Sequence, residues 1–210
     1  MFTQDTFQFF QDVQANNSRD WWLANKSRYE AVVKQPIIDL TNHLSLIYSE
    51  AHIFRPNRDT RFTKDKSPYK SNISFSMADG KGSFYLQLDG SGILLGGGIY
   101  EPNNQQLRDW RTIFDSDHKT IVKDFLYEGL QKGYEIMQEN ALKTVPRGWP
   151  KDHPEVEYLR LKHATIFKKF TKDDWMMTPA AFDVILDGFD FVHEWNAILN
   201  RLIISKWSPN

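Results

Sequence analysis

The chain has 210 residues, no cysteine and a formal net charge of -1. The length suits one domain over residues 1–210, and the missing cysteine excludes disulfides, thiolate nucleophiles and cysteine-ligated zinc or iron–sulfur sites. The near-neutral charge excludes a general polyanion-binding surface, so electrostatic recognition must be local. The N-terminus lacks the basic and apolar regions of a secretory signal, and no apolar run approaches the roughly 18 residues of a membrane span. We therefore expect a cytoplasmic protein that does not contact a membrane.

Residues 1–50 show the apolar spacing of helices. Ser18 is the expected N-cap of a helix over "RDWWLANKSRYEAVV", because a serine hydroxyl can accept a hydrogen bond from the first turn. Pro36 is expected to interrupt this helix and to begin the next one, "PIIDLTNHLSLIYSEA".

The middle of the chain changes to the alternating pattern of strands. Apolar and polar residues alternate in "SNISFSMA" and "SFYLQLD", and the turn sequence "DGSG" separates the second of these from "ILLGGGIY". These three stretches predict an antiparallel meander.

Residues 102–145 return to a helical period, and Pro146, Pro150 and Pro154 predict irregular chain after them. The stretch "LRLKHATIFKKF" fits a strand or a short helix, and Thr178 with Pro179 begins a long final helix. The predicted fold class is α+β, with an antiparallel sheet of three or more strands and N-terminal and C-terminal helices packed against it.

The segment "RPNRDTRFTKDKSPYK", residues 55–70, concentrates positive charge in a nearly neutral chain. Arginine binds phosphate or carboxylate through two parallel hydrogen bonds, so the segment predicts a site for an anionic small molecule. Two alternatives remain open: a non-catalytic interaction module that docks an acidic protein surface, or arginines that pair internally and bind no ligand. The ligand-binding candidates here are Arg58, Arg61, Lys64, Lys66, Tyr69 and Lys70.

Two positions outside this segment are also candidates for the ligand site. Gly97 lies in a run of three glycines, which lets a ligand approach bare backbone or lets the chain pack tightly. Arg147 begins a loop, residues 147–153, that could close over the ligand.

The sequence does not decide whether the protein is an enzyme. If it is one, His153 or Asp152 is the candidate acid/base, followed by Tyr69. The six histidines show no metal-binding spacing, and no nucleotide-binding glycine motif is present, so we expect neither a metal nor a cofactor. Nucleic acid is not favoured as a partner, because it requires a broader basic surface. The sequence leaves the oligomeric state open.

Four blocks of the chain resemble the ordered signature of the DUF2461 family, which has no assigned function. The blocks are "NNSRDWWLANKSRYE", "RPNRDTRFTKDKSPYK", "YLQLDGSGILLGGGIYEP" and "PRGWPKDHPEVEYLRLK". The resemblance implies one family domain of mixed helix and sheet and supplies no reaction, cofactor or catalytic residue. It also marks the arginine-rich segment as a family feature with a dedicated role. Trp22 departs from the family pattern, where phenylalanine is common, and this difference concerns packing.

Overall fold

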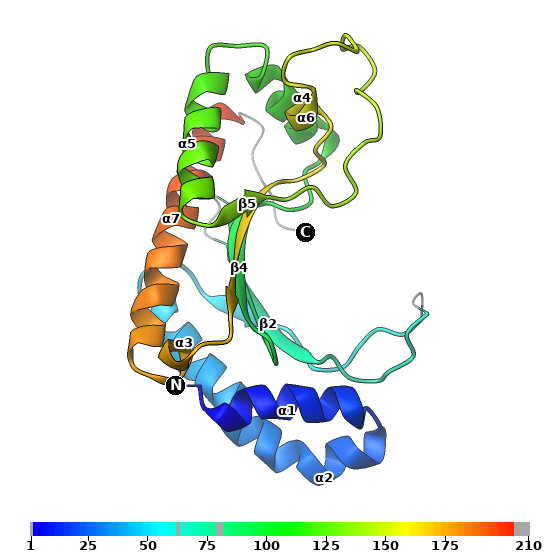
Figure 1. Ribbon diagram of the computed structural model, residues 1–210, viewed down its shortest axis with the longest axis vertical. Coiled ribbons are helices and arrows are strands. Elements are labelled where there is room, and N and C mark those ends of the chain that lie inside the picture. The colour runs from blue at the N-terminus through cyan, green and yellow to red at the C-terminus, as the bar shows by residue number, and fades with distance from the viewer. Residues whose placement is uncertain (1, 62–63, 79–81, 204–210) are drawn as a thin grey trace. The chain divides into compact units, whose positions relative to one another are not determined.

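The computed structural model of the protein describes residues 2–61, 64–78 and 82–203. Among these residues the strands form one antiparallel sheet in the order β1-β2-β3-β4-β6-β5, with helices at both ends of the chain (Figure 1). The predicted α+β class is therefore confirmed. No helix of the described part is long and apolar enough to cross a bilayer.

The helical elements are α1 (Gln4–Ala15), α2 (Arg19–Tyr29), the π-helical turn η1 (Glu30–Lys34), α3 (Gln35–Ser45), α4 (Asn104–Ile113), α5 (Lys119–Gln131), α6 (Val156–Leu159), the short 3-10 helix η2 (Asp174–Met177) and α7 (Ala180–Leu202). The strands are β1 (Ala51–Ile53), β2 (Asn72–Ala78), β3 (Ser83–Asp89), β4 (Gly92–Ile99), β5 (Tyr134–Ile136) and β6 (Ala164–Thr171). The meander β2-β3-β4 has the predicted neighbours.

The chain divides into two compact units, each assembled from separate segments. The first unit contains Met1–Met77, Tyr85–Leu95 and Lys169–Gly188. The second contains Ala78–Phe84, Gly96–Lys168 and Phe189–Asn210. Strands β2, β3, β4 and β6 and helix α7 contribute residues to both units. The single domain over residues 1–210 stays a prediction.

In the first unit, α1 and α2 pack through aromatic rings. The Phe9 ring lies 5.9 Å from the ring of Trp22 and 5.7 Å from that of Tyr29. Arg28 adds an ion pair between the helices, with its Nη1 2.7 Å from Asp12 Oδ2. Ser18 Oγ accepts a hydrogen bond from the Trp21 N–H at 3.3 Å, so the predicted N-cap is confirmed.

Pro36 lies at the start of α3, as expected, but the expected interruption of the helical path before it was wrong. The π-helical turn η1 joins α2 directly to α3, and Pro36 lies in the first turn of α3. A proline has no N–H to donate to the carbonyl four residues before it, which here belongs to Val32. The Thr6 hydroxyl of α1 donates to this carbonyl instead, at 2.6 Å. A hydrogen bond from a neighbouring helix thus satisfies the group that the proline leaves without a helical donor.

In the second unit, Trp195 of α7 occupies the centre of the core. It is fully buried, and its indole N–H donates to the Ala164 carbonyl at 3.0 Å. The rings of Trp110 and Phe125 lie 6.2 Å and 5.5 Å from it. Large aromatic side chains from α4, α5 and α7 therefore form this core, as the aromatic composition indicates.

Strand β5 lies within residues 102–145, where the sequence pattern predicts helix, and strand β1 begins where the predicted N-terminal helical region ends. Gly133 adopts φ +83° after α5, and the next three residues form β5, paired with β6. Strand β1 follows α3 in the same way and pairs with β2. Three residues are too few to show an alternating pattern, so only pairing within the sheet makes these segments strands.

Replacing Thr6 by valine tests the hydrogen bond to the Val32 carbonyl. Thr6 is fully buried, and its hydroxyl also accepts from the Thr3 N–H at 3.0 Å. The substitution removes this donor from a part-buried carbonyl, so we expect the free energy of unfolding to fall by about 0.5–1.5 kcal/mol in urea titrations. Thr41→Val is the matched control, because the Thr41 hydroxyl bonds a carbonyl of its own helix. An equal loss in both variants would contradict the special role of Thr6.

Candidate anion-binding site

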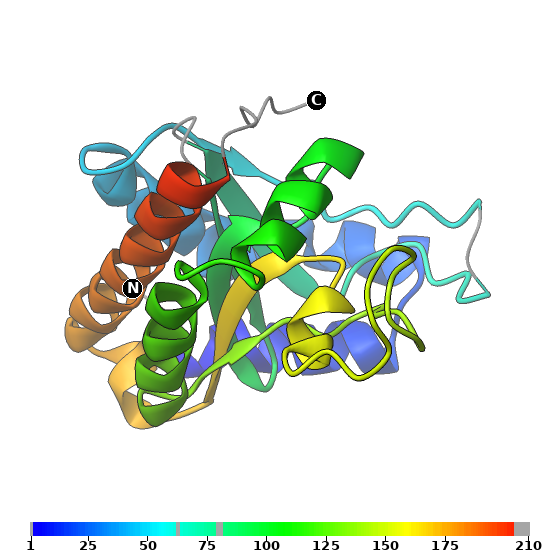
Figure 2. The same cartoon turned by 90° about the horizontal axis from the view of Figure 1, so that it is seen from above.

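The basic segment is residues 55–70, and its described residues, 55–61 and 64–70, lie on a loop that extends away from the helices of its unit (Figures 1 and 2). Its root is closed by an antiparallel bridge between Asn57 and Tyr69. The Arg58 N–H donates to the Pro68 carbonyl at 2.9 Å, and the Lys70 N–H donates to the Pro56 carbonyl at 2.8 Å. The two ends of the loop are therefore held together by backbone hydrogen bonds.

The arginines nearer the tip pair with aspartates of the same loop. Arg58 forms an ion pair with Asp65, and Arg61 Nη2 lies 2.7 Å from Asp59 Oδ2. The hydrogen bond from Arg61 lowers the pKa of Asp59. The Arg61 side chain is 75% exposed, so the pair lies in solvent, and such pairs contribute little to stability.

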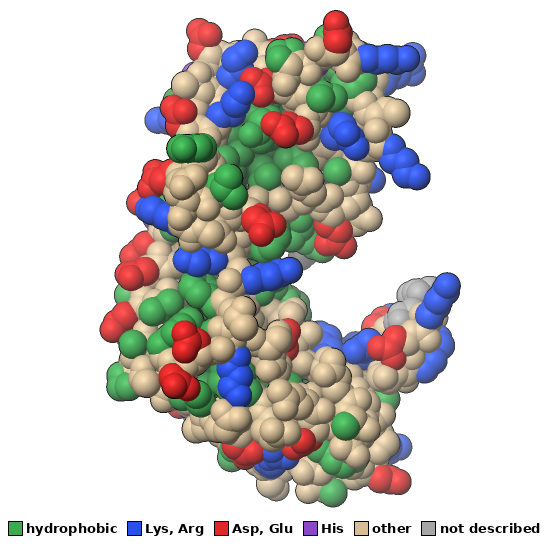
Figure 3. Space-filling view, viewed as in Figure 1, with side chains coloured by type: hydrophobic (Ala, Val, Ile, Leu, Met, Phe, Trp, Pro, Cys, Tyr) green, Lys and Arg blue, Asp and Glu red, His purple; other side chains and the backbone are tan. Residues whose placement is uncertain are grey.

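The two lysines near the tip lie on its surface. Lys66 Nζ donates to the Thr60 carbonyl at 2.8 Å, and Lys64 is exposed. Figure 3 shows basic and acidic side chains together on the projecting loop. The clamp predicted from Arg58, Arg61, Lys64 and Lys66 stays a prediction, and the contacts of three of these residues lie within the loop itself.

Tyr69 fixes the root of the loop to α2. Its ring stacks on the Trp22 indole with centroids 4.1 Å apart and an interplanar angle of 7°. The Asn17 amide donates to the Tyr69 carbonyl at 2.9 Å and accepts from the Tyr69 N–H at 3.1 Å. The side chain of Tyr69 is buried, so its main observed contacts are structural.

A groove of about 770 Å³ lies between the root of the loop and the helical segment α2–η1. Aromatic rings form part of its walls: Trp22 and Tyr29 from the helix, and Phe54 and Tyr69 from the root of the loop. The volume is within the range that small-molecule sites occupy.

Three cations line this groove without a partner in the described structure. Arg19 and Lys26 come from α2, and Arg55 comes from the root of the loop. None of the three makes a hydrogen bond or an ion pair with a described residue. Arg19 and Lys26 are seven residues apart, so they share one helix face with a rise of about 10 Å between them. The two other charges in the lining cancel, because Lys34 Nζ pairs with Glu30 Oε2 at 2.8 Å.

The positive charges at the root of the loop also act on one another. Burial lowers the pKa of Lys70, and the nearby charges of Arg55 and Arg58 lower it further. The Lys70 ammonium lies 5.6 Å from the centroid of the Phe54 ring. A cluster whose members disfavour each other's charge is one that an anion would stabilise.

Gly97 and Arg147, the remaining ligand-binding candidates, belong to the second unit. A Cβ on Gly97 would lie 2.0 Å from the Ser83 carbonyl oxygen and 2.4 Å from Val192 Cγ1. Close packing between β3 and α7 therefore accounts for the glycine without a ligand. Arg147 is exposed in the loop before α6. Their part in a ligand site stays a prediction.

His153, the candidate acid/base, has both ring nitrogens engaged in the fold. Nε2 lies 3.0 Å from Asp115 Oδ1, and Nδ1 accepts from the Glu155 N–H at 3.1 Å. The neighbouring Asp152 is exposed. Because a base needs a lone pair that can reach substrate, this geometry favours a structural role for His153. A catalytic role for either residue stays a prediction. In the part of the chain with described positions, no three acidic or histidine side chains gather as a metal site would require.

Sequence reasoning did not identify Arg19 and Lys26 as site residues. The available signal was their spacing of seven within "NNSRDWWLANK", which places two cations on one helix face beside Trp22. What the sequence could not show is that Arg55, thirty residues further on, lies across the same groove.

These features define the class of the protein: an α+β protein with a basic, aromatic-walled groove on its N-terminal helices. The chain belongs to the family of conserved hypothetical proteins DUF2461, whose model matches residues 5–197. The resemblance inferred from the four sequence blocks is thereby confirmed. No curated protein and no solved structure matches the chain.

Asn17→Ala should release the root of the basic segment from α2. The substitution removes both hydrogen bonds to the Tyr69 backbone, so we expect trypsin to cleave within residues 55–70 about tenfold faster. Peptide mapping over a digestion time course measures this rate. Asn25→Ala is the control, because the Asn25 amide bonds the Trp21 carbonyl within its own helix. Unchanged cleavage in Asn17→Ala would show that stacking alone holds the root.

Tyr29 should make the stability of the protein sensitive to alkaline pH. Burial, with a smaller contribution from Glu30, raises the pKa of Tyr29 from 10.0 to about 12. The neutral phenol therefore stabilises the fold fully below pH 10, and this contribution is lost as the pH rises towards 12. Wild type should lose up to about 1 kcal/mol more than Tyr29→Phe between pH 9 and pH 11 in urea unfolding. If wild type and Tyr29→Phe lost the same stability between pH 9 and pH 11, the raised pKa of Tyr29 would be contradicted.

Proposed function

We propose that the protein binds a small molecule carrying phosphate or carboxylate groups in the groove of the first unit. The observation that carries this proposal is the set of three cations, Arg19, Lys26 and Arg55, that line one groove without partners in the described structure. All three cations are exposed, but they come from two separate segments and line the same space.

The charge of the groove favours a ligand with more than one negative charge. Glu30 and Lys34 neutralise each other, which leaves the three cations unbalanced. Charge-assisted hydrogen bonds from arginine to phosphate or carboxylate are about twice as strong as neutral ones. Lys70 increases the positive field at the root of the loop, although it is not part of the lining. Inorganic pyrophosphate, a nucleoside diphosphate and citrate all have suitable charge.

The aromatic walls make the groove a better site than a flat basic surface. Trp22 and Tyr69 are buried and stacked on each other, and they hold the two sides of the groove in place. A preformed site loses less conformational entropy when the ligand binds. The alternative of internally paired arginines describes Arg58 and Arg61, which pair with aspartates of the same loop, but it does not describe Arg55.

Isothermal titration calorimetry with inorganic phosphate, pyrophosphate, ADP and citrate tests this proposal at low and moderate salt. We expect at least one multivalent anion to bind wild type, with an affinity that falls as salt rises. At 100 times its Kd the ligand should add about 2.7 kcal/mol to the free energy of unfolding. Lys26→Ala/Arg55→Ala should reduce the affinity at least about tenfold, since charged hydrogen bonds contribute about 1.5–3 kcal/mol each.

Arg61→Ala/Lys66→Ala is the matched control, because both residues lie on the same loop and make contacts within it. This control should retain wild-type affinity. If only the control variant lost binding, the anion site would lie at the tip of the loop, and its proposed location in the groove would be contradicted. Absence of binding by all four anions to wild type would overturn the proposed function.

A further inference from the structure

Strand β5, in the second unit, forms one edge of the sheet. It pairs with β6 on one side, and no other strand of the described residues pairs with its opposite side. An uncovered edge presents backbone N–H and C=O groups that can pair with another chain. The edge therefore offers a position where an extended segment can add to the sheet.

The register identifies the groups that face this edge. The Met137 N–H donates to the Thr165 carbonyl at 2.8 Å, and Ile136 lies opposite Ile166. Hydrogen-bonded and non-hydrogen-bonded pairs alternate in an antiparallel ladder, so the N–H and C=O of Ile136 point away from β6. Within the described structure, the backbone of Ile136 has no hydrogen-bond partner across this edge.

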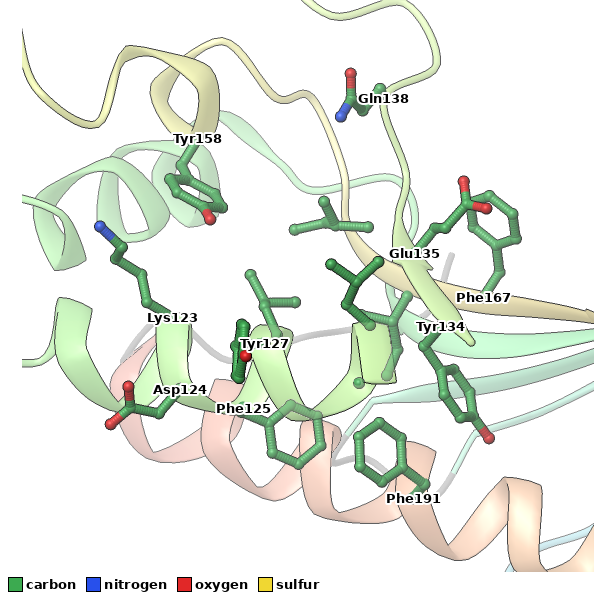
Figure 4. A pocket seen from close by; sticks show the side chains of 15 residues that line it. Lys123, Asp124, Phe125, Tyr127, Tyr134, Glu135, Gln138, Tyr158, Phe167 and Phe191 are labelled. Atoms are coloured by element: carbon green, nitrogen blue, oxygen red, sulfur yellow. The ribbon is translucent and has the colours of Figure 1, made fainter. Parts of the chain in front are cut away.

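A cavity of about 880 Å³ lies along the same strand, bordered by α5, α6 and β6. Its lining includes the apolar Leu126, Ile136 and Ile166, and Figure 3 shows hydrophobic side chains in the hollow beside α5. The charged residues of the lining are Lys123, Asp124 and Glu135. Two large side chains at its rim are exposed: Tyr127 by 68% and Leu130 by 59%. Figure 4 shows Tyr127 and Phe125 on α5 on one side of the cavity and β5 on the other. Exposed apolar side chains beside an open strand are typical of an interaction surface.

The opposite face of β5 carries a negative charge. Glu135 alternates with Tyr134 and Ile136, so its side chain leaves the strand on the other side, yet it also borders the cavity (Figure 4). Glu135 is exposed and makes no ion pair with a described residue. The nearby Lys132 pairs instead with Glu128, at 2.7 Å. A partner strand would therefore meet the apolar side chain of Ile136 on one face of β5 and the carboxylate of Glu135, which also borders the cavity, on the other.

We propose that β5 and this cavity bind an extended peptide segment of a partner protein, in which apolar and basic residues alternate. The partner would add as a strand beside β5, because directly opposed residues in a sheet share a face. Its apolar side chains would enter the cavity next to Ile136, and its basic side chain would lie beside Glu135. A second copy of this chain fits less well, because full overlap of two antiparallel β5 strands would place two Glu135 carboxylates opposite each other.

Fluorescence anisotropy with synthetic peptides and the full chain tests this proposal. The probe is a fluorescein-labelled octapeptide, Gly-Ser-Val-Arg-Val-Arg-Val-Ser. We expect it to bind in the micromolar range, as short strand additions do, and to bind at least about tenfold tighter than the same peptide with glutamate in place of arginine. A version with N-methylated central valine should also bind at least about tenfold more weakly, because it cannot pair with the strand edge.

Three variants separately test the backbone edge of β5, the charge of Glu135 and the exposed apolar rim of the cavity. Ile136→Pro removes the N–H that faces the open edge and leaves the ladder to β6 intact, so binding should weaken about tenfold. Glu135→Lys should reverse the preference from the arginine peptide to the glutamate peptide. Leu130→Asp, at an exposed position, should weaken binding about tenfold, whereas Ile121→Asp on the same helix should not. Leu130→Asp keeps the test decisive if the proline variant fails to fold.

Four results would overturn the proposal. The first is wild type that binds neither peptide at millimolar concentration, and the second is wild type that binds the N-methylated peptide equally well. Glu135→Lys could leave the arginine preference unchanged. Finally, light scattering could show wild type as a dimer that Leu130→Asp dissociates while no peptide binds, which would make a second copy the occupant of this face.

Discussion

The attachment of Tyr69 to α2 is the contact on which the candidate site depends. The Asn17 amide pairs with both backbone groups of Tyr69, and the tyrosine ring stacks on Trp22. These contacts join segments that are 52 residues apart in the chain. They connect the root of the loop, which backbone hydrogen bonds already close, to the N-terminal helices. Arg55 of this root and Arg19 and Lys26 of α2 line the same groove.

Helix α2 carries Arg19 and Lys26, and its position depends on how the chain continues through Pro36 into α3. The π-helical turn and the Thr6 hydroxyl let α2 continue into α3 through Pro36. Phe9 and Arg28 then hold α2 against α1. The groove therefore has a rigid wall, which is what a preformed anion site requires, and the loop supplies the opposite side.

The two halves of the chain use their polar residues differently. In the first unit, cations line a groove without partners in the described structure, whereas in the second unit His153 and Glu155 belong to an internal polar network. His153 bonds Asp115 and Glu155, and Glu155 in turn pairs with Lys123 at 2.8 Å. The second unit instead leaves an open strand edge and an apolar cavity, which suit a peptide better than a charged small molecule. The two proposals thus concern different surfaces and different chemistry.

The sequence by itself determined the features that depend on neighbours along the chain. The alternation of apolar and polar residues predicted β2, β3 and β4, and Ser18 predicted the start of α2. The density of arginine and lysine identified the basic segment at residues 55–70. Tertiary structure decided everything that depends on distant partners. It formed β1 and β5 from three residues each, and it satisfied the Val32 carbonyl through Thr6. It also selected Arg55 for the groove, while Arg58 and Arg61 pair within the loop. The physical reason is that periodicity and capping act over a few residues, whereas the partner of a charge is whichever group the fold brings within a few ångströms.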